Sequence, residues 1–314
     1  MDVVHGSASL ARSLDHPVLT IGNFDGLHLG HRSIIDTVVE QANALGGEPV
    51  VYTFDPHPRA VLFPDRAPKR LVTMEQKLEL FEAEGISMVI VEPFTLEFSR
   101  ISPEQFVREH VHRAIAPRKV YLGYDFHFGK DREGSMRLFT ELGPELGFEV
   151  TIIPEVKIAD LDVNSTRIRS LLGEGNVEEA KQLLGRPYAI RGEVVHGEGR
   201  GVTMGFPTAN LASENEVLPG AGVYAGELRI MEGEGATYPT VVNVGFRPTF
   251  HKQAELSIEA HLLDFKGDLY GVRAELSFEK RIRAEQRFPD QEALKAQIRE
   301  DLVAARQVLG LVDG

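Results

Sequence analysis

The sequence predicts two different halves: an α/β half with a parallel, Rossmann-like sheet, then an all-β half that forms an antiparallel barrel or sandwich. Up to about Ile153, short apolar runs alternate with helical patterns, which is typical of parallel strands joined by crossover helices. After Gly185-Arg-Pro-Tyr188, the runs are short, alternate with period two and are separated by glycine and proline. The length of 314 residues suits two domains, which we expect at 1–184 and 185–314.

The first half opens with an apolar run at 18–21, a glycine turn and a helix that ends near Gly46. Ser102-Pro-Glu-Gln105 provides a cap residue and a proline for another helix start. Four prolines between Pro56 and Pro68 predict a loop that covers a site. The remaining strands are expected at 49–54, 88–91 and 119–124, and the remaining helices at 73–84 and 102–114.

In the second half, the expected strands lie at 189–195, 223–230, 238–244, 256–264 and 272–278. A short helix at 177–184 precedes them. A closing helix begins after Pro289-Asp290. Its apolar stripe consists of Leu294, Ile298, Leu302, Ala305 and Leu309.

The composition excludes several classes of protein. With 34 Lys and Arg against 47 Asp and Glu, the net charge is −13, which disfavours a nucleic-acid partner. The chain has no Cys, so it has neither disulfides nor thiolate metal sites. No apolar run reaches membrane length, and the start lacks the features of a leader peptide. We therefore expect a cytoplasmic protein that binds small molecules.

The most informative stretch is Gly22-Asn-Phe-Asp25 followed by His28-Leu-Gly-His31. The first amides of a helix attract anions, and histidines three residues apart lie on one side of the helix, where both can donate to phosphate. Gly22 and Gly30 allow a nucleotide to approach the backbone. The alternatives are a buried structural pair, or a metal pair, which is the weakest because no acidic third ligand lies nearby.

A second anion-binding pattern is Asn164-Ser-Thr-Arg-Ile-Arg169. Asn164 or Ser165 can cap a helix whose free amides, hydroxyls and guanidiniums would form an anion pocket. Taken alone, the segment also fits an ordinary capped surface helix with exposed arginines.

In the second half, the glycine-rich stretch from His196 to Asn210 contains the candidate nucleotide site. It is not a Walker A loop because no Lys-Ser/Thr follows its glycines, and alone it also fits a flexible loop. Thr208 and Asn210 offer two hard oxygen ligands on one side of an extended segment, which suits Mg²⁺ bound with nucleotide phosphates.

The run Leu256-Ser-Ile-Glu-Ala-His-Leu262 alternates with period two. Its apolar residues face one way, so Glu259 faces solvent or a cleft, where it can accept a proton from an alcohol. A carboxylate on a solvated strand face is the alternative interpretation.

The first-half motifs resemble those of the adenylyl- and cytidylyltransferase superfamily. In detail they resemble the amino-terminal domain of bacterial bifunctional riboflavin kinase/FAD synthetases. The resemblance implies that His28 and His31 are catalytic, and Asn164 departs from it because the family usually has Ser there. His57 and Arg59 match the family's Asp-Pro-His-Pro segment, although a structural role for His57 is as plausible. The implied nucleotide and flavin contacts are Gly22, Asn23, Phe24, Asp25, Gly30, Asp125, Ser165, Thr166 and Arg169.

The second half resembles the riboflavin kinase domain of that family, notably at Phe206-Pro-Thr-Ala-Asn210, Gly222-Val-Tyr-Ala225 and Asn243-Val-Gly245. This resemblance implies a six-stranded antiparallel barrel with a C-terminal helix, Mg²⁺ on Thr208 and Asn210, and Glu259 as the base. Val202 departs from the pattern, since the family usually has a basic residue there. The implied kinase contacts to ATP are Gly199, Arg200, Gly201, Gly205, Pro207, Thr208 and Asn210.

Together the resemblances imply that riboflavin is phosphorylated to FMN and that FMN is adenylylated to FAD, with ATP as co-substrate of both steps. One alternative is a riboflavin kinase whose amino-terminal domain is inactive or uses another acceptor. Another is a flavin-binding regulatory protein without turnover. The oligomeric state stays open at this point.

Overall fold

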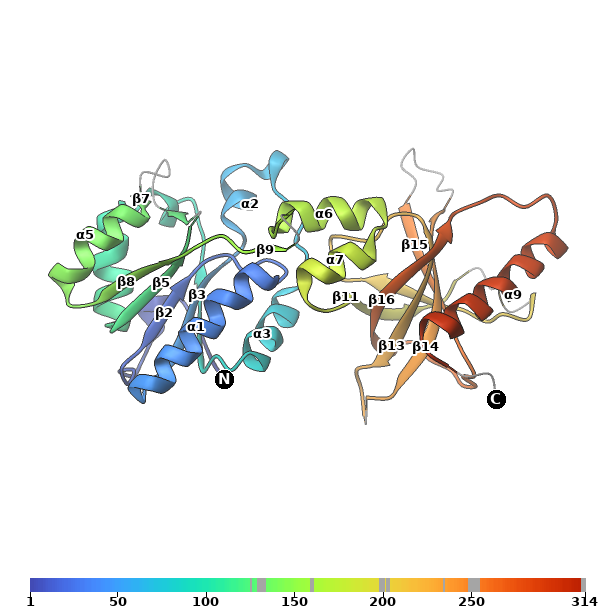
Figure 1. Cartoon of the computed structure of the whole chain (residues 1–314), viewed down its shortest axis with the longest axis horizontal. Helices are drawn as coiled ribbons and strands as arrows, with labels where there is room; N and C mark the ends of the chain where they lie inside the picture. The colour runs from blue at the N-terminus through green and yellow to red at the C-terminus, as the bar shows by residue number, and fades with distance from the viewer. Residues whose placement is uncertain are drawn as a thin grey trace. The chain divides into compact units, whose positions relative to one another are not determined.

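The computed structural model describes residues 1–124, 126–128, 134–158, 161–197, 201, 204–233, 235–247 and 255–311. The chain forms two compact units (Figure 1), and each is described by itself. The first consists of Met1–Lys69 and Thr73–Asn164, and the second of Arg70–Val72 and Ser165–Gly314.

The first unit contains a six-stranded sheet in which all neighbouring strands are parallel. This confirms the α/β fold class. The sequence analysis missed the edge strand β1, because its side chains are mostly exposed and show no alternation. In spatial order the strands are β1 (Asp2–His5), β4 (Met88–Pro93), β3 (Pro49–Asp55), β2 (Val18–Ile21), β5 (Lys119–Gly123) and β8 (Glu149–Ile153).

Helices cover both faces of this sheet. On one face, α1 (Leu29–Leu45) and α3 (Met74–Ala83) pack Ile35 and Phe81 against Val18 of β2 and its neighbours. On the other, the helical segment at 103–113 and α5 (Met136–Leu146) pack against Leu19 and its neighbours. Successive residues of β2 therefore enter opposite cores, as expected for a central parallel strand.

Three local features refine the predicted elements. The proline-rich stretch is not wholly a loop, because it contains α2 (Pro58–Leu62) and a 3₁₀ turn η2 (Pro64–Arg66). The Ser102 hydroxyl accepts a hydrogen bond from the Gln105 amide at 3.2 Å, so it caps α4 (Pro103–Gln105) as predicted. The helix then continues with π-helical turns, η4 (Phe106–Arg113). The other short elements are η1 (Ser7–Ser9), η3 (Phe98–Arg100), β6 (His127–Phe128), β7 (Gly134–Ser135), β9 (Lys157–Ile158) and β10 (Leu161–Asp162).

A buried polar cluster orders the amino-terminal segment. The Glu92 carboxylate accepts hydrogen bonds from the Ser7 amide (2.8 Å), the Ser7 hydroxyl (2.7 Å) and the Tyr52 hydroxyl (2.5 Å). Burial and the Glu92 charge raise the pKa of Tyr52, so the phenol stays a donor. Such contacts join residues 40 and 85 positions apart along the chain, and no local pattern could have predicted them.

The second unit is a closed barrel of six antiparallel strands. This confirms the fold that the resemblance implied. Strand β12 was not predicted as a strand, because Ala-Asn-Leu-Ala-Ser has little β propensity. In spatial order the strands are β11 (Tyr188–Val195), β12 (Ala209–Ser213), β15 (Glu255–Leu262), β14 (Thr237–Arg247), β13 (Gly222–Ile230) and β16 (Arg273–Ala284).

The closing helix α9 (Gln291–Val308) lies on the outside of the barrel (Figure 1). The Asp290 carboxylate accepts the Ala293 amide at 2.8 Å and caps it. Ala305 packs on Val223 and neighbouring apolar side chains. Two hydrogen bonds, of 2.9 and 2.8 Å, join the Arg283 guanidinium to the buried carboxylate of Asp301 and attach the helix to β16.

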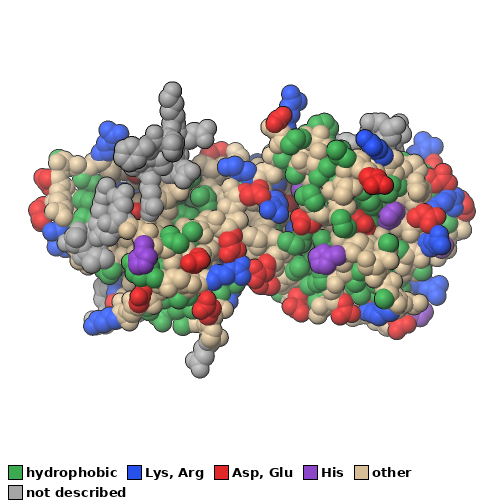
Figure 2. All heavy atoms as spheres, turned by 180° about the vertical axis from the view of Figure 1, so that it is seen from behind, with side chains coloured by type: hydrophobic (Ala, Val, Ile, Leu, Met, Phe, Trp, Pro, Cys, Tyr) green, Lys and Arg blue, Asp and Glu red, His purple; other side chains and the backbone are tan. Residues whose placement is uncertain are grey.

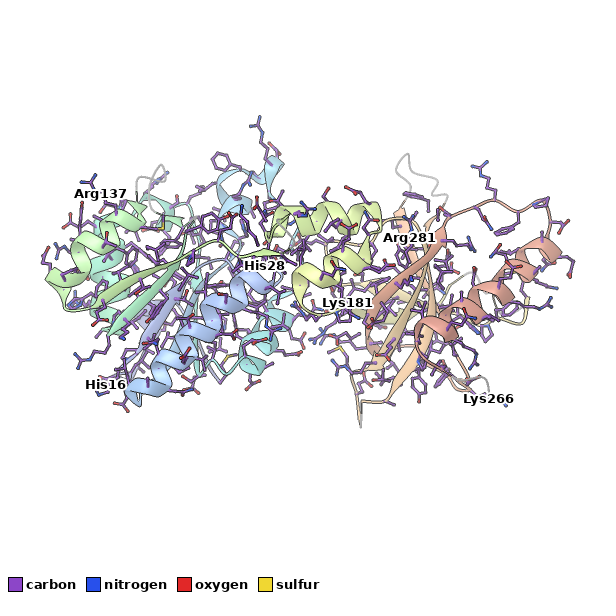
Figure 3. All side chains as sticks on the ribbon, viewed as in Figure 1. His16, His28, Arg137, Lys181, Lys266 and Arg281 are labelled. Atoms are coloured by element: carbon purple, nitrogen blue, oxygen red, sulfur yellow. The ribbon has the colours of Figure 1, made fainter. Side chains whose placement is uncertain are left out.

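Two further helices, α6 (Ser165–Glu174) and α7 (Val177–Leu184), belong to the barrel unit. Figure 3 labels the cations that hold them, Lys181 on α7 and Arg281 on β16. Arg281 donates to the Glu174 carbonyl at 3.0 Å, and Lys181 pairs with Glu279 at 2.5 Å. The expected functional boundary after residue 184 stays a prediction, while the compact units divide after Asn164.

Candidate functional site

The turn between β2 and α1 adopts an unusual backbone conformation. Phe24, Gly26 and Leu27 have φ values of 47°, 83° and 39°, in the left-handed region that costs energy for residues other than glycine. The Phe24 ring folds back over Gly22, where an added Cβ would lie 3.0 Å from the ring. Gly22 therefore permits this close approach, and Phe24 is almost fully buried.

His28 and His31 come together at the amino end of α1, where Figure 3 labels His28. Their rings stack with centroids 3.6 Å apart and an interplanar angle of 17°. His28 is the N-cap residue, and its Nδ1 accepts the His31 amide at 3.3 Å. Because Nδ1 is an acceptor, the hydrogen of the neutral ring lies on Nε2. The ring can thus donate to an anion while it caps the helix.

Gly30 lies between these histidines and a neighbouring backbone. A Cβ at this position would lie 3.2 Å from His28 Nδ1 and 3.3 Å from the Val163 carbonyl oxygen. The glycine therefore leaves space for the stacked pair beside the chain at residue 163.

Unsatisfied polar atoms gather around the same turn. Six buried side-chain nitrogen or oxygen atoms lack a hydrogen-bond partner in the described part of the chain, and three of them are Thr20 Oγ1, Asn23 Oδ1 and His31 Nδ1. Native proteins rarely leave such atoms unpaired without a functional reason. Polar atoms of this kind suit a ligand with donors and acceptors, such as a nucleotide.

Burial lowers the pKa of His31 well below its usual value, and the nearby charges of His28 and Lys77 lower it further. His31 is therefore neutral at pH 7. Among the described residues, no group of three or more His, Cys, Asp or Glu side chains is placed to hold a metal ion.

We predict that the stability of this unit falls as the pH drops below about 6.5. Below that pH, His31 is protonated in the unfolded chain but stays neutral in the folded one. The free energy of unfolding therefore decreases by at most about 1.4 kcal/mol per pH unit because of this group. Denaturant unfolding of His31→Gln between pH 7 and 5 should show a smaller pH slope than the wild type. The exposed His5, changed to Gln, is the matched control and should keep the wild-type slope. If His31→Gln kept the wild-type pH slope, a lowered pKa of His31 in the folded protein would be contradicted.

Ser165, Thr166 and Arg169 lie in the first turns of α6, which the buried side chain of Ile168 anchors. They belong to the barrel unit, whereas the two histidines belong to the sheet unit. Capping by Asn164 or Ser165 stays a prediction. Asp125 lies outside the described residues.

His57 has a visible structural role. Its Nδ1 accepts the Arg59 amide at 3.1 Å, so it is the N-cap of α2. This supports the structural interpretation of His57, and Arg59 is exposed.

The candidate kinase residues form a row across three strands of the barrel. Glu259 on β15 is in register with Asn210 on β12 and with Asn243 on β14. Partners in register share a face of the sheet. The neighbouring residues Ala260 and Val242 are fully buried on the other face. The predicted alternation of β15 is therefore correct, and the structure adds Asn243, whose place beside Glu259 depends on strand pairing.

The segment that leads into β12 is tightly packed. His261 Nδ1 lies 2.8 Å from the Pro207 carbonyl oxygen, and the Phe206 amide donates to the Gly201 carbonyl at 2.8 Å. A Cβ on Gly197 would lie only 2.2 Å from the Asn210 amide nitrogen. Gly205 has a φ of 88°, which favours glycine. Gly199 and Arg200 lie outside the described residues, as does Val202.

Two family models match the chain, FAD synthetase at residues 11–167 and riboflavin kinase at residues 184–309. The chain is 36% identical over 312 residues to the bifunctional riboflavin kinase/FMN adenylyltransferase of Escherichia coli, covering 99% of both chains. It is 39% identical over 288 residues to that of Listeria monocytogenes, covering 90% of each. This chain belongs to the bifunctional riboflavin kinase/FMN adenylyltransferase family.

A crystal structure named as a macrolide-efflux protein from Streptococcus pneumoniae is also similar to this family member. Its TM-score is 0.87 at 28% identity, and the match covers 98% of this chain and 99% of that one. The printed name of that structure describes the Streptococcus pneumoniae protein and not this chain. In the described part of this chain, no helix is both long and apolar enough to cross a membrane.

Charged side chains of both signs lie on the surface of this riboflavin kinase/FMN adenylyltransferase family member. On the face drawn in Figure 2, acidic and basic side chains are interspersed, and no extended basic area appears among the coloured residues.

The family's kinase reaction uses nucleotide phosphates, and the residues at β12 fit a magnesium ion. Thr208 and Asn210 supply a hydroxyl and an amide oxygen, which are hard ligands. The absence of a side chain at Gly197 leaves space around the Asn210 amide, since a Cβ there would overlap it. Glu259 is the register partner of Asn210. A Mg²⁺–nucleotide site therefore suits this side of the barrel.

We predict that Gly197→Ala slows riboflavin phosphorylation about tenfold or more, because the new methyl group displaces the Asn210 amide and misplaced groups in an active site are costly. FMN-to-FAD conversion by the same protein should not change. Gly173→Ala is the matched control, since a Cβ there meets nothing within 4 Å. A kinase rate equal to that of the control would show that Asn210 has no positional role. Initial rates with riboflavin and with FMN provide the measurement.

Two residues of α3 that the sequence did not single out support the turn between β2 and α1. The buried side chain of Lys77 donates to the Asn23 carbonyl oxygen at 2.9 Å. One helical turn later, the ring of Phe81 meets that of Phe24 edge to face at 5.6 Å. The available signal was a lysine four residues before a buried phenylalanine, on the same face of the helix.

Proposed function

We propose that this chain makes FAD from riboflavin in two ATP-dependent steps, one in each half. The observation that carries the proposal is the match of both family models within one chain that aligns with bifunctional relatives over almost its full length. The riboflavin kinase half forms FMN. The FAD synthetase half joins FMN to an adenylyl group and releases pyrophosphate.

In the kinase step, Glu259 accepts the proton of the ribityl primary alcohol as that oxygen attacks the γ-phosphorus of ATP. The register pairing of Glu259 on β15 with Asn210 on β12 supports this role. Thr208 and Asn210 would hold Mg²⁺, which supplies positive charge to the phosphates when bound. Gly199, Arg200, Gly201, Gly205 and Pro207 complete the proposed nucleotide-binding segment.

In the adenylyl transfer, an FMN phosphate oxygen attacks the α-phosphorus of ATP, and the bond to pyrophosphate breaks. Negative charge develops on the α-phosphate oxygens, so the reaction needs fixed donors rather than a covalent nucleophile. The Nε2 hydrogen of His28 and the first amides of α1 provide such donors. The buried, unpaired Nδ1 of His31 supports a ligand at the same place. Ser165, Thr166 and Arg169 are the proposed partners of the triphosphate.

A kinase with an inactive amino-terminal half would not need these features. Selection for structure alone would favour pairing or replacing the buried polar atoms of Thr20, Asn23 and His31. A flavin-binding regulator without turnover would likewise not need a base beside the proposed magnesium ligands. The cytoplasmic location stays a prediction from the sequence.

The test is a time course of the purified protein with riboflavin, ATP and Mg²⁺, in which chromatography separates the flavins. FMN should appear first and then give way to FAD. FMN without FAD would leave only a kinase, and tight flavin binding without ATP consumption would favour a regulator. Replacing Mg²⁺ by a chelator should stop both steps if the metal is required.

A further inference from the structure

Helix α3 supports two consecutive residues of the turn between β2 and α1. The Lys77 ammonium donates to the Asn23 carbonyl oxygen at 2.9 Å. The Phe81 ring, four residues later, packs edge to face on Phe24 with centroids 5.6 Å apart. The two supports therefore come from one face of one helix and act on adjacent residues of the turn.

The position of Lys77 along its helix is well defined. Thr73 and Gln76 form a capping box: the Thr73 hydroxyl accepts the Gln76 amide at 3.1 Å, and the Gln76 side chain accepts the Thr73 amide at 3.0 Å. Lys77 follows directly, and its own amide donates to the Thr73 carbonyl at 3.0 Å. The capping box therefore fixes the first turn of α3, from which the Lys77 side chain extends.

Lys77 is only 7% exposed, although burial of an ammonium is costly unless its hydrogen bonds are made. Apolar residues would suffice if α3 only had to cover the sheet. The lysine contacts the part of the chain whose backbone is strained, since Phe24 and Leu27 both have positive φ. Strained segments persist only where their surroundings hold them, and they cluster at functional sites.

The turn that Lys77 holds also carries polar atoms of the proposed adenylyltransferase site. Asn23, whose carbonyl Lys77 binds, has a buried side-chain oxygen without a partner among the described residues. The Phe24 ring, next in the chain, contacts the His31 ring edge to face at 5.2 Å. A shift of the turn would therefore move both the Asn23 amide and the ring that supports His31.

We propose that Lys77 is a positioning residue of the adenylyl transfer, whose hydrogen bond to the Asn23 carbonyl fixes the Gly22–Asp25 turn against the His28–His31 pair. This inference rests on the proposed adenylyltransferase function of the turn. The Lys77 charge has a second effect in the same direction, because it helps lower the pKa of His31 and keeps that ring neutral.

The test compares three variants by steady-state kinetics of FMN-to-FAD conversion. Lys77→Met keeps the volume but removes the donor, and Lys77→Gln keeps a donor without the charge. Lys119→Met is the matched control: Lys119 is also partly buried and donates to Gln41 at 3.0 Å, but it begins β5, at the opposite end of the strands from the histidine turn. Thermal unfolding and the riboflavin kinase rate are recorded for each variant.

We expect Lys77→Met to lower kcat for FAD formation about tenfold or more, with a much smaller change in KM for ATP, because displaced catalytic groups mainly affect the reacting geometry. Lys77→Gln should recover most of that kcat. Lys119→Met should match the wild type in FAD formation, and the kinase rate should stay constant in all three.

A Lys77→Met protein with wild-type kcat would overturn the inference. Equal losses in Lys77→Met and Lys77→Gln would also overturn it, since the hydrogen bond would then not be what matters. A purely structural role would lower the unfolding temperature and leave kcat per folded molecule unchanged. His28→Ala separates the two proposals: if it leaves FAD formation intact, the site itself is wrong, whereas if it abolishes FAD formation while Lys77→Met does not, only this inference fails.

Discussion

Replacing Glu259 by Gln should lower the rate of riboflavin phosphorylation by roughly 10²–10⁴-fold, the usual contribution of a positioned general base. Glutamine keeps the size of the side chain but cannot accept the proton of the ribityl alcohol. Asn210 and Asn243, the register partners of Glu259, keep their own side chains. ATP and riboflavin should therefore still bind, and kcat should change more than either KM.

The same preparation provides the control for folding. FMN-to-FAD conversion should stay at the wild-type rate in Glu259→Gln, because the histidine motif belongs to the other compact unit. Glu227→Gln removes a carboxylate from an exposed position on β13, where its register partner is Pro239, and should leave both rates unchanged. Near-wild-type phosphorylation by Glu259→Gln would exclude it as the base.

Replacing His28 by Ala should lower the rate of FAD formation from FMN by roughly 10²–10³-fold, as is typical when one fixed donor to a developing charge is lost. The kinase rate should be unaffected. The ring also caps α1, so its removal costs about 1 kcal/mol of stability in addition. Initial rates of pyrophosphate release with FMN and ATP give the measurement.

A second substitution separates capping from chemistry. Asn is a good N-cap residue, so His28→Asn should restore the stability of α1 without restoring FAD formation. If His28→Asn recovered the rate, the histidine would act only through the helix start. The exposed His5 on β1, changed to Ala, should leave the rate of FAD formation unchanged.

Much of the fold could be predicted because its elements are locally encoded. The buried runs of β2, β3 and β4 and the helical periodicity of α1 and α9 reflect period and capping, which neighbouring residues determine. β1 and β12 were missed because their stability comes from pairing with β4, and with β11 and β15, rather than from their own residues. The short helix α2 was hidden by prolines that usually end helices, although proline is tolerated in a first turn.

The residues of the candidate sites also fall into two groups, those that local spacing predicts and those that depend on tertiary contacts. His28 and His31 were found because helical spacing alone brings i and i+3 together, and their stacking at 3.6 Å follows that rule. The tertiary partners of Lys77 and Asn243 could not be predicted, because Lys77 lies 54 residues from the carbonyl that it binds and the place of Asn243 beside Glu259 depends on the register of β14 with β15. Their roles come from tertiary contacts.

The attachment of α6 and α7 to the barrel limits how the gene can be divided. A fragment that begins at Gly185 would lose Lys181, which pairs with Glu279, and Glu174, whose carbonyl accepts a hydrogen bond from Arg281. It would also lose the buried side chains of Ala180 and Leu183 on α7. A fragment that begins at Ser165 would keep both contacts together with the whole of α6 and α7. A riboflavin kinase fragment that keeps both contacts therefore has to begin at or before Glu174 rather than at Gly185.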